Sequence, residues 1–158
     1  MNIRPLRDDE RDRVIEAGLG LSRLPRDDGS FYLVAWDGEE PLGHAHLALT
    51  GPPEVQDVEV LERHRGRGIG TALVEAAARE AAARGFDRLT ITVSTGKPQV
   101  QALYERAGFR DAGLPLRRVT GTVQIRTGPL VVDDTLRTLS ISLAAVRRPG
   151  DTDDRREK

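Results

Sequence analysis

The sequence contains no cysteine, which excludes a disulfide framework, a thiol nucleophile and a metal site built on thiolates. Lysine is nearly absent, since Lys97 and Lys158 are the only two. The 24 basic residues are balanced by 25 acidic ones, so a net charge of −1 provides no general attraction to nucleic acid or to an acidic membrane. The N-terminus lacks the apolar core of a signal peptide, and no apolar run approaches the roughly 20 residues that cross a bilayer. We expect a cytoplasmic protein that binds neither nucleic acid nor a membrane.

The residues that are present fit one globular domain. At 158 residues, the chain is long enough to bury roughly 70% of its unfolded surface around a single core. We expect one domain over residues 1–147, because no internal repeat or second domain is visible in the sequence. Residues 148–158 are charged and carry no apolar anchor, which predicts a disordered tail.

Hydrophobic periodicity predicts several strands around three helices. The expected strands cover residues 3–6, 31–36, 42–49, 55–61, 89–93, 119–125 and 136–146, with Gly128-Pro129 and Asp133-Asp134 joining the last two. A first helix is expected to start at Asp8. A second covers residues 69–84 and buries the stripe Ile69, Leu73, Ala76, Ala77 and Ala81. A third starts at Pro98, with Leu103 and Phe109 expected in the core.

The turn between the strand at 55–61 and the helix at 69–84 is the most informative segment. It reads Arg65-Gly66-Arg67-Gly68-Ile69-Gly70-Thr71. The first N–H groups of a helix have no intrahelical partner, and the helix dipole adds partial positive charge there. Glycines at alternate positions allow a phosphate to approach these N–H groups, and two arginines add charge and donors. The segment predicts a diphosphate site.

Spacing excludes two common nucleotide motifs at this turn. A Walker loop requires lysine and then serine or threonine after its last glycine, whereas Thr71-Ala72 follows Gly70. The dinucleotide fingerprint requires a glycine three residues after its second one, and Thr71 and Leu73 occupy the two candidate positions.

Two motifs and the strand between them resemble the GNAT family of N-acetyltransferases, which bind acetyl-coenzyme A. Arg65-x-x-Gly68-x-Gly70 is similar to the family signature Q/R-x-x-G-x-G/A, and the strand at 89–93 follows at a suitable distance. The run from Leu103 to Phe109 is similar to the segment "LYExxGF". The resemblance covers nearly the whole chain. It implies an α/β (α+β) fold with a twisted, mostly antiparallel mixed sheet of six or seven strands, helices on both faces, and a V-shaped gap between the fourth and fifth strands that admits the cofactor.

The resemblance also implies the cofactor contacts. Backbone N–H groups of Arg65, Gly66, Arg67, Gly68, Ile69, Gly70 and Thr71 would hold the diphosphate of acetyl-coenzyme A. Val58 and Val60 would bind the pantetheine arm like an added strand, and one of their N–H groups would polarise the thioester carbonyl. Lys97 stands where the family often has asparagine, so we expect it to meet a phosphate or solvent instead. No metal is expected.

The catalytic residues are likewise implied by the resemblance. Tyr104 matches the family's usual general acid, although periodicity alone favours a core position for it. Glu59 occupies the strand position where members often carry a base, and Asp57 lies two residues earlier, on the same face if no bulge intervenes. On residue type alone, two solvated acids are an equally good interpretation.

His44 and His46 alternate onto one face of the neighbouring strand. An H-x-H pair can bind zinc, but no third ligand stands at a characteristic spacing. A half-exposed structural pair is the leading interpretation, and a relay beside Asp57 and Glu59 is the alternative.

Taken together, these features predict acetyl transfer from acetyl-coenzyme A to a primary amine by direct attack in a ternary complex. A non-catalytic acyl-coenzyme A-binding or sensing module is the first alternative, and an interaction protein without coenzyme A affinity is the second. Acceptor walls are expected from residues 19–31 and 114–134, which carry no motif that identifies a small-molecule or peptide amine. A homodimer through the last strand is possible.

Overall fold

The computed structural model of the protein describes residues 1–146, so the tail expected at 148–158 lies outside the described residues. The strands are β1 (Asn2–Pro5), β2 (Phe31–Asp37), β3 (Glu40–Ala48), β4 (Glu54–Val60), β5 (Arg88–Ser94), β6 (Arg110–Asp111), β7 (Arg117–Ile125) and β8 (Gly128–Ser142). The helices are α1 (Arg11–Glu16), α2 (Ile69–Ala83) and α3 (Pro98–Arg106), with 3-10 turns η1 (Asp8–Glu10) and η2 (Glu62–His64). None of the helices among residues 1–146 is long and apolar enough to span a membrane.

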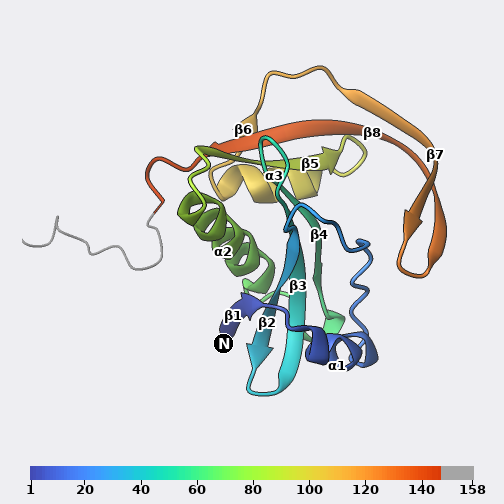
Figure 1. The fold of residues 1–158 in the computed structure, drawn as a ribbon. Helices are drawn as coiled ribbons and strands as arrows, with labels where there is room; N and C mark the ends of the chain where they lie inside the picture. The colour runs from blue at the N-terminus through green and yellow to red at the C-terminus, as the bar shows by residue number, and fades with distance from the viewer. Residues whose placement is uncertain (147–158) are drawn as a thin grey trace, which may run out of the picture.

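All eight strands form one sheet in the order β1-β2-β3-β4-β5-β8-β6, with β7 paired to β8 (Figure 1). Every pair is antiparallel except β4 and β5, which run parallel. The expected twisted, mostly antiparallel sheet with helices is therefore confirmed. The strand beyond the expected seven is β6, which is only two residues long.

Two hydrophobic clusters cover the two faces of this sheet. The predicted stripe of α2 is buried, and it joins Leu33 and Ala35 of β2 in the larger cluster. Val34 and Trp36 of β2 belong to the smaller cluster, together with Val14 of α1. Because successive residues of a strand point to opposite faces, α1 and α2 lie on opposite sides of the sheet.

The middle of the sheet opens between β4 and β5. Only two residue pairs join these strands, Glu54 with Thr90 and Val55 with Ile91. Beyond Val55, β4 continues on the side of β3 alone. The approach to β3 is close, since a Cβ on Gly43 would lie 2.7 Å from the Glu59 carbonyl oxygen, which only glycine avoids. The expected gap between the fourth and fifth strands is confirmed.

A bulge interrupts β4 beside this gap. Glu59 pairs with His44 and Gln56 pairs with His46, so Asp57 and Val58 both lie opposite the single residue Ala45. Asp57 has a φ of +50°, in the left-handed region that non-glycine residues rarely adopt. The sequence places Asp57 on the same face as Glu59 only if the strand has no bulge. β4 does have one, so that condition is not met.

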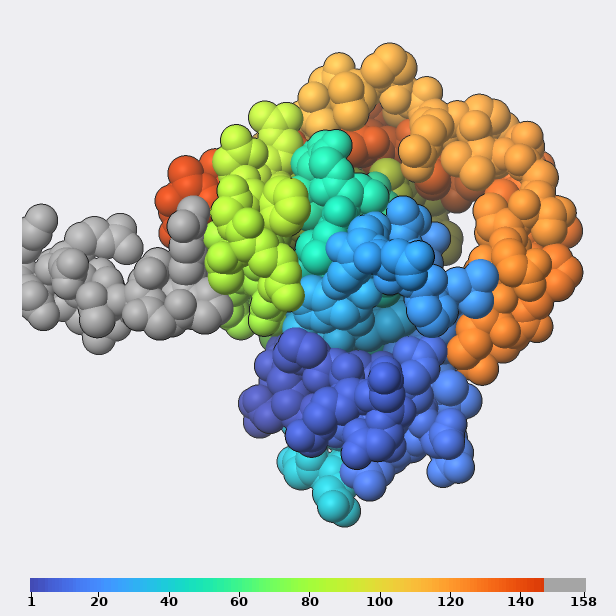
Figure 2. Space-filling view, viewed as in Figure 1, coloured from blue at the N-terminus to red at the C-terminus, as the bar shows by residue number. Residues whose placement is uncertain are grey.

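β7 and β8 form a long hairpin that arches away from the body of the protein (Figure 1). Gly128-Pro129 and Asp133-Asp134, expected as connections, lie inside β8, and the turn falls at 126–127. The prediction was wrong because most of the outer hairpin is exposed on both faces, so its sequence lacks the apolar alternation that marks a half-buried strand. Figure 2 shows an opening between the hairpin and the N-terminal segment.

The first helix is shorter than a typical helix and is held by ion pairs. Two hydrogen bonds of 2.8 and 2.6 Å join the Arg4 guanidinium to the buried Glu10 carboxylate. These bonds hold the pKa of Glu10 at about 2. α1 then ends at Glu16, and the chain continues in a loop over the sheet face that carries the polar residues of β3 and β4.

Candidate active site

The glycine turn before α2 presents unpaired backbone N–H groups. The first helical hydrogen bond runs from the Ala72 N–H to the Gly68 carbonyl, so the N–H groups just before Ala72 have no intrahelical acceptor. Gly66 and Gly68 both have a φ of +79°, and a Cβ built on either would meet no other atom within 4 Å. The turn is therefore open to a ligand and is made by a conformation that favours glycine.

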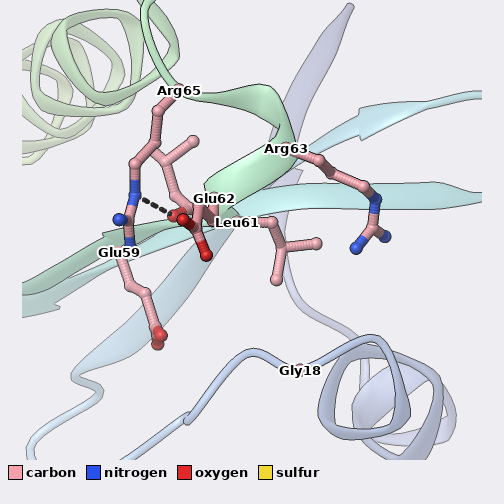
Figure 3. Close-up of a pocket in the computed structure, with 7 residues that line it drawn as sticks. Gly18, Glu59, Leu61, Glu62, Arg63 and Arg65 are labelled. Carbon is pink, nitrogen blue, oxygen red and sulfur yellow. Dashed lines mark hydrogen bonds between the residues drawn. The ribbon is translucent and has the colours of Figure 1, made fainter.

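The arginines of the turn take different positions. The Arg65 Nε donates to the Val60 carbonyl (3.0 Å), which ties the turn to the end of β4, while the exposed Arg67 guanidinium lies 3.5 Å from His64. Beside the turn lies a pocket of about 560 Å³, lined by Gly18, Glu59, Val60, Leu61, Glu62, Arg63 and Arg65. Figure 3 shows the Glu59 carboxylate extending from β4 toward the chain at Gly18.

A second cleft, of about 280 Å³, follows the gap between β4 and β5. Asp57 and Val58 line it from β4, and Lys97 and Tyr104 line it from the α3 side. The Tyr104 ring packs edge-on against Phe109, with the ring centroids 6.0 Å apart. Burial raises the pKa of Tyr104, so its hydroxyl keeps its proton at neutral pH. Leu103, expected in the core, is 41% exposed because its side of α3 faces solvent.

An acid pair and a histidine meet on the α1 face of β3 and β4. The His44 Nε2 lies 3.2 Å from Glu59 Oε1 and 4.0 Å from Asp57 Oδ2. The structure thus brings Asp57 and Glu59 together across the bulge. Both histidines are buried, at 0% and 3% exposure, so the half-exposed pair expected for His44 and His46 is wrong.

The loop after α1 covers these groups and explains their burial. Its consecutive N–H groups donate to four side chains: Gly20 to Glu59 (2.9 Å), Leu21 to His44 Nε2 (3.1 Å), Ser22 to Asp57 (3.2 Å) and Arg23 to the Tyr32 hydroxyl (2.7 Å). The Tyr32 hydroxyl in turn donates to Asp57 Oδ2 at 2.7 Å. The sequence offered no signal for this loop, because its contacts come from backbone groups rather than from a side-chain motif.

His46 differs from His44 in chemistry although both lie beside the Tyr32 ring, with centroids 4.8 and 4.9 Å away. The His46 Nδ1 is buried without a hydrogen-bond partner, and burial lowers the pKa of this histidine. His46 is therefore a neutral ring packed in the interior, and it is not among the residues whose potential ligand atoms cluster around His44.

His44, Asp57 and Glu59 do offer three atoms that all lie within 4.8 Å of one another. Each of these atoms already accepts a hydrogen bond from a loop N–H, from Leu21, Ser22 and Gly20 respectively. A cation at this position would have to displace that loop. The arrangement is a hydrogen-bonded support for the loop and for the two acids.

Residues 4–109, more than half of the chain, match the family described as Acetyltransferase (GNAT) family. The chain belongs to this family. GNAT acetyltransferases use acetyl-coenzyme A, and the open glycine turn and the cleft beside it fit that cofactor.

Several curated GNAT relatives are larger than this chain. It is 38% identical over 129 residues to a mycothiol acetyltransferase of Acidothermus cellulolyticus, which covers 71% of this chain and 38% of that protein. It is 37% identical over 68 residues to a streptothricin acetyltransferase of Streptomyces lavendulae, covering 43% and 36%. The chain thus spans little more than a third of the length of these relatives. A solved spermidine/spermine N-acetyltransferase, SpeG from Vibrio cholerae, has the same fold, with a TM-score of 0.68, 14% identity and coverage of 90% and 92%.

Gly68→Ala is expected to weaken coenzyme A binding by roughly tenfold or more, because a methyl group on the turn interferes with a charge-assisted phosphate contact. Gly85→Ala is the matched control, since Gly85 also has a positive φ (+88°) and open space around it, but at the other end of α2. Both variants should lower the melting temperature by a similar amount. Isothermal titration with coenzyme A should distinguish them, and equal losses of affinity would contradict the assignment of the turn.

Proposed function

We propose that this GNAT protein transfers an acetyl group from acetyl-coenzyme A to a primary amine of a small molecule by direct attack in a ternary complex. One observation carries this proposal: in β4, Val58 lines the cleft beside Tyr104, and the neighbouring Glu59 lines the pocket beside the glycine turn. A thioester bound on one side of the bulge would thus face a base on the other. Proximity of this kind contributes a large part of the rate acceleration in many enzyme-catalysed acyl transfers.

The residues that would hold the donor form a continuous path. The N–H groups of the turn from Arg65 to Thr71 would bind the diphosphate. The edge of β4 at Val58 and Val60, which has no partner from β5, would bind the pantetheine arm. Lys97 is the N-cap residue of α3 and lines the cleft, so its ammonium would reach a phosphate bound there.

Glu59 is the better base of the two acids. The Asp57 Oδ2 already accepts hydrogen bonds from Tyr32 and Ser22, and its side chain is 22% exposed. The Glu59 side chain is 37% exposed and reaches the larger pocket. Asp57 is better suited to holding the loop.

Tyr104 would supply the proton to the departing thiolate. Its hydroxyl stays protonated because burial raises its pKa, and the ring lines the same cleft as Val58. A general acid must reach the leaving group rather than the amine. Its place on α3, across the cleft from β4, fits that requirement.

A cationic amine suits the acids of the acceptor side, since Asp57 and Glu59 together attract positive charge. The relatives named for acetylation of mycothiol, streptothricin and spermidine support a small-molecule acceptor.

The test combines binding with turnover. Calorimetric titration with coenzyme A measures the donor site, and a panel of amines assayed by release of free thiol measures transfer. We expect micromolar-range binding and turnover with at least one amine, as is usual for enzymes. Binding without turnover across mono-, di- and polyamines, amino sugars and peptide amines would favour a sensing module. No binding at millimolar coenzyme A would refute the proposal altogether.

A further inference from the structure

A chain of hydrogen bonds crosses the protein from the β7–β8 turn to the bulge of β4. The Arg126 Nε donates to the Gly20 carbonyl (2.8 Å), and the Leu21 N–H of the same peptide group donates to the His44 Nε2 (3.1 Å). On its other side, the His44 Nδ1 lies 2.9 Å from the Asp57 carbonyl oxygen. The donors and acceptors therefore alternate from Arg126 to β4.

These contacts define the protonation of His44. The Asp57 carbonyl can only accept, so Nδ1 must carry the proton that lies between them. The Leu21 N–H can only donate, so Nε2 must provide a lone pair. The two hydrogen bonds therefore place a proton on Nδ1 and a lone pair on Nε2, and the ring transmits the hydrogen bond from the loop to the bulge.

The direction of the next N–H follows from the planarity of the peptide bond. Gly51-Pro52 is the cis bond found in residues 1–146, so the peptide between Asp57 and Val58 is trans. In a trans peptide the C=O and N–H groups point in opposite directions. Because the Asp57 carbonyl points at His44 on β3, the Val58 N–H points away from β3, toward the cleft that Val58 lines.

We propose that His44 is a positioning residue that holds the bulged Asp57–Val58 peptide so that the Val58 N–H points into the cleft as a polarised donor. The role of this donor in polarising the thioester carbonyl rests on the proposed function, whereas its direction and polarisation do not. Hydrogen bonds in such chains strengthen one another, by about 10–30% per bond. Asp57 needs this support, because its φ of +50° is unfavourable for a residue with a side chain.

Two substitutions of His44 separate this role from packing. His44→Phe keeps a ring of similar size but removes the donor to Asp57. His44→Asn loses volume but places an amide N–H where Nδ1 was. If His44 only fills space, the phenylalanine variant should resemble the natural protein more closely. If it holds the peptide, the asparagine variant should.

The first readout is nuclear magnetic resonance of the protein without cofactor. The Val58 amide proton should move upfield in His44→Phe and recover in part in His44→Asn. His46→Phe is the control, since His46 is also buried beside Tyr32 but its Nδ1 has no hydrogen-bond partner, whereas the Nδ1 of His44 bonds this peptide. In the natural protein, long-range nitrogen spectra should show the proton of His44 on Nδ1. Two results would overturn the inference: a His44 proton on Nε2 in the natural protein, or a Val58 amide proton that does not shift in His44→Phe. The first is measured on the natural protein, so it decides the question even if the variant folds poorly.

The second readout is kinetic. The kcat should fall about tenfold in His44→Phe, less than the 10²–10³-fold typical when a carbonyl-polarising donor is lost outright, and the KM for acetyl-coenzyme A should change little. His44→Asn should recover part of this loss. If the natural protein transfers acetyl to no amine while the Val58 amide still responds to His44, the proposed function fails and the positioning role stands. If turnover is robust and insensitive to both variants, the positioning role fails and the function stands.

Discussion

Glu59→Gln is expected to lower the kcat of acetyl transfer by roughly 10²-fold or more while coenzyme A binds with unchanged affinity, because the glutamine amide cannot take the proton of the attacking amine. The fold around the substitution should remain, since the glutamine oxygen can still accept the Gly20 N–H and the side chain is already 37% exposed. Steady-state kinetics with the best amine of the panel, together with calorimetry, measure both quantities.

Glu62→Gln is a fitting control, because Glu62 lines the same pocket without contacting His44. It should retain nearly full turnover.

Asp57→Asn provides the contrast in stability: Asp57 accepts hydrogen bonds from both Tyr32 and Ser22, so its loss of charge should lower the melting temperature more than Glu59→Gln does. A large loss of kcat in Asp57→Asn with normal turnover in Glu59→Gln would assign the base to Asp57 instead.

The structural features that the sequence predicted well are those defined by local backbone geometry. The glycine turn and the apolar stripe of α2 are short-range features, since the helix period and the positive φ of Gly66 and Gly68 depend on neighbouring residues. The gap between β4 and β5 followed from the family resemblance and is confirmed by their two residue pairs.

The parts that could not be predicted depend on contacts between distant segments. The Gly20 N–H meets a carboxylate 39 residues away, and the Arg126 side chain meets the Gly20 carbonyl 106 residues away. Neither contact has a signature, because a backbone amide is present at every non-proline position. The burial of His44 follows from the same loop, so a strand pattern that predicted half-exposure could not anticipate it.

The bulge in β4 shows how one such feature changes the meaning of a sequence pattern. Alternation alone places Asp57 and Glu59 on one face, and the structure brings them together through a bulge rather than through regular alternation. The same bulge turns the Val58 N–H away from β3. The acid pair and the direction of the Val58 N–H are thus both consequences of the one extra residue in β4.

Tyr104→Phe is expected to lower kcat by roughly 10²-fold with acetyl-coenzyme A as donor, because the departing thiolate loses its general acid. The aromatic contact with Phe109 should persist, so the melting temperature should change little. If Tyr104 is the general acid, its protonated form must be present for turnover. Because burial raises the pKa of Tyr104 above its ordinary value of 10.0, any loss of rate from its deprotonation should occur at higher pH than for an exposed tyrosine.

An acyl donor with a more acidic leaving group separates acid catalysis from packing. Such a leaving group departs without a proton, so the defect of Tyr104→Phe should shrink when an activated acetyl ester replaces acetyl-coenzyme A. A defect of equal size with both donors would mean that the hydroxyl positions the cofactor rather than protonating it. Val100→Ala, also on the cleft side of α3, is the control for packing, and its smaller effect should be the same with either donor. Normal turnover in Tyr104→Phe would remove the tyrosine from the mechanism and leave solvent as the proton source.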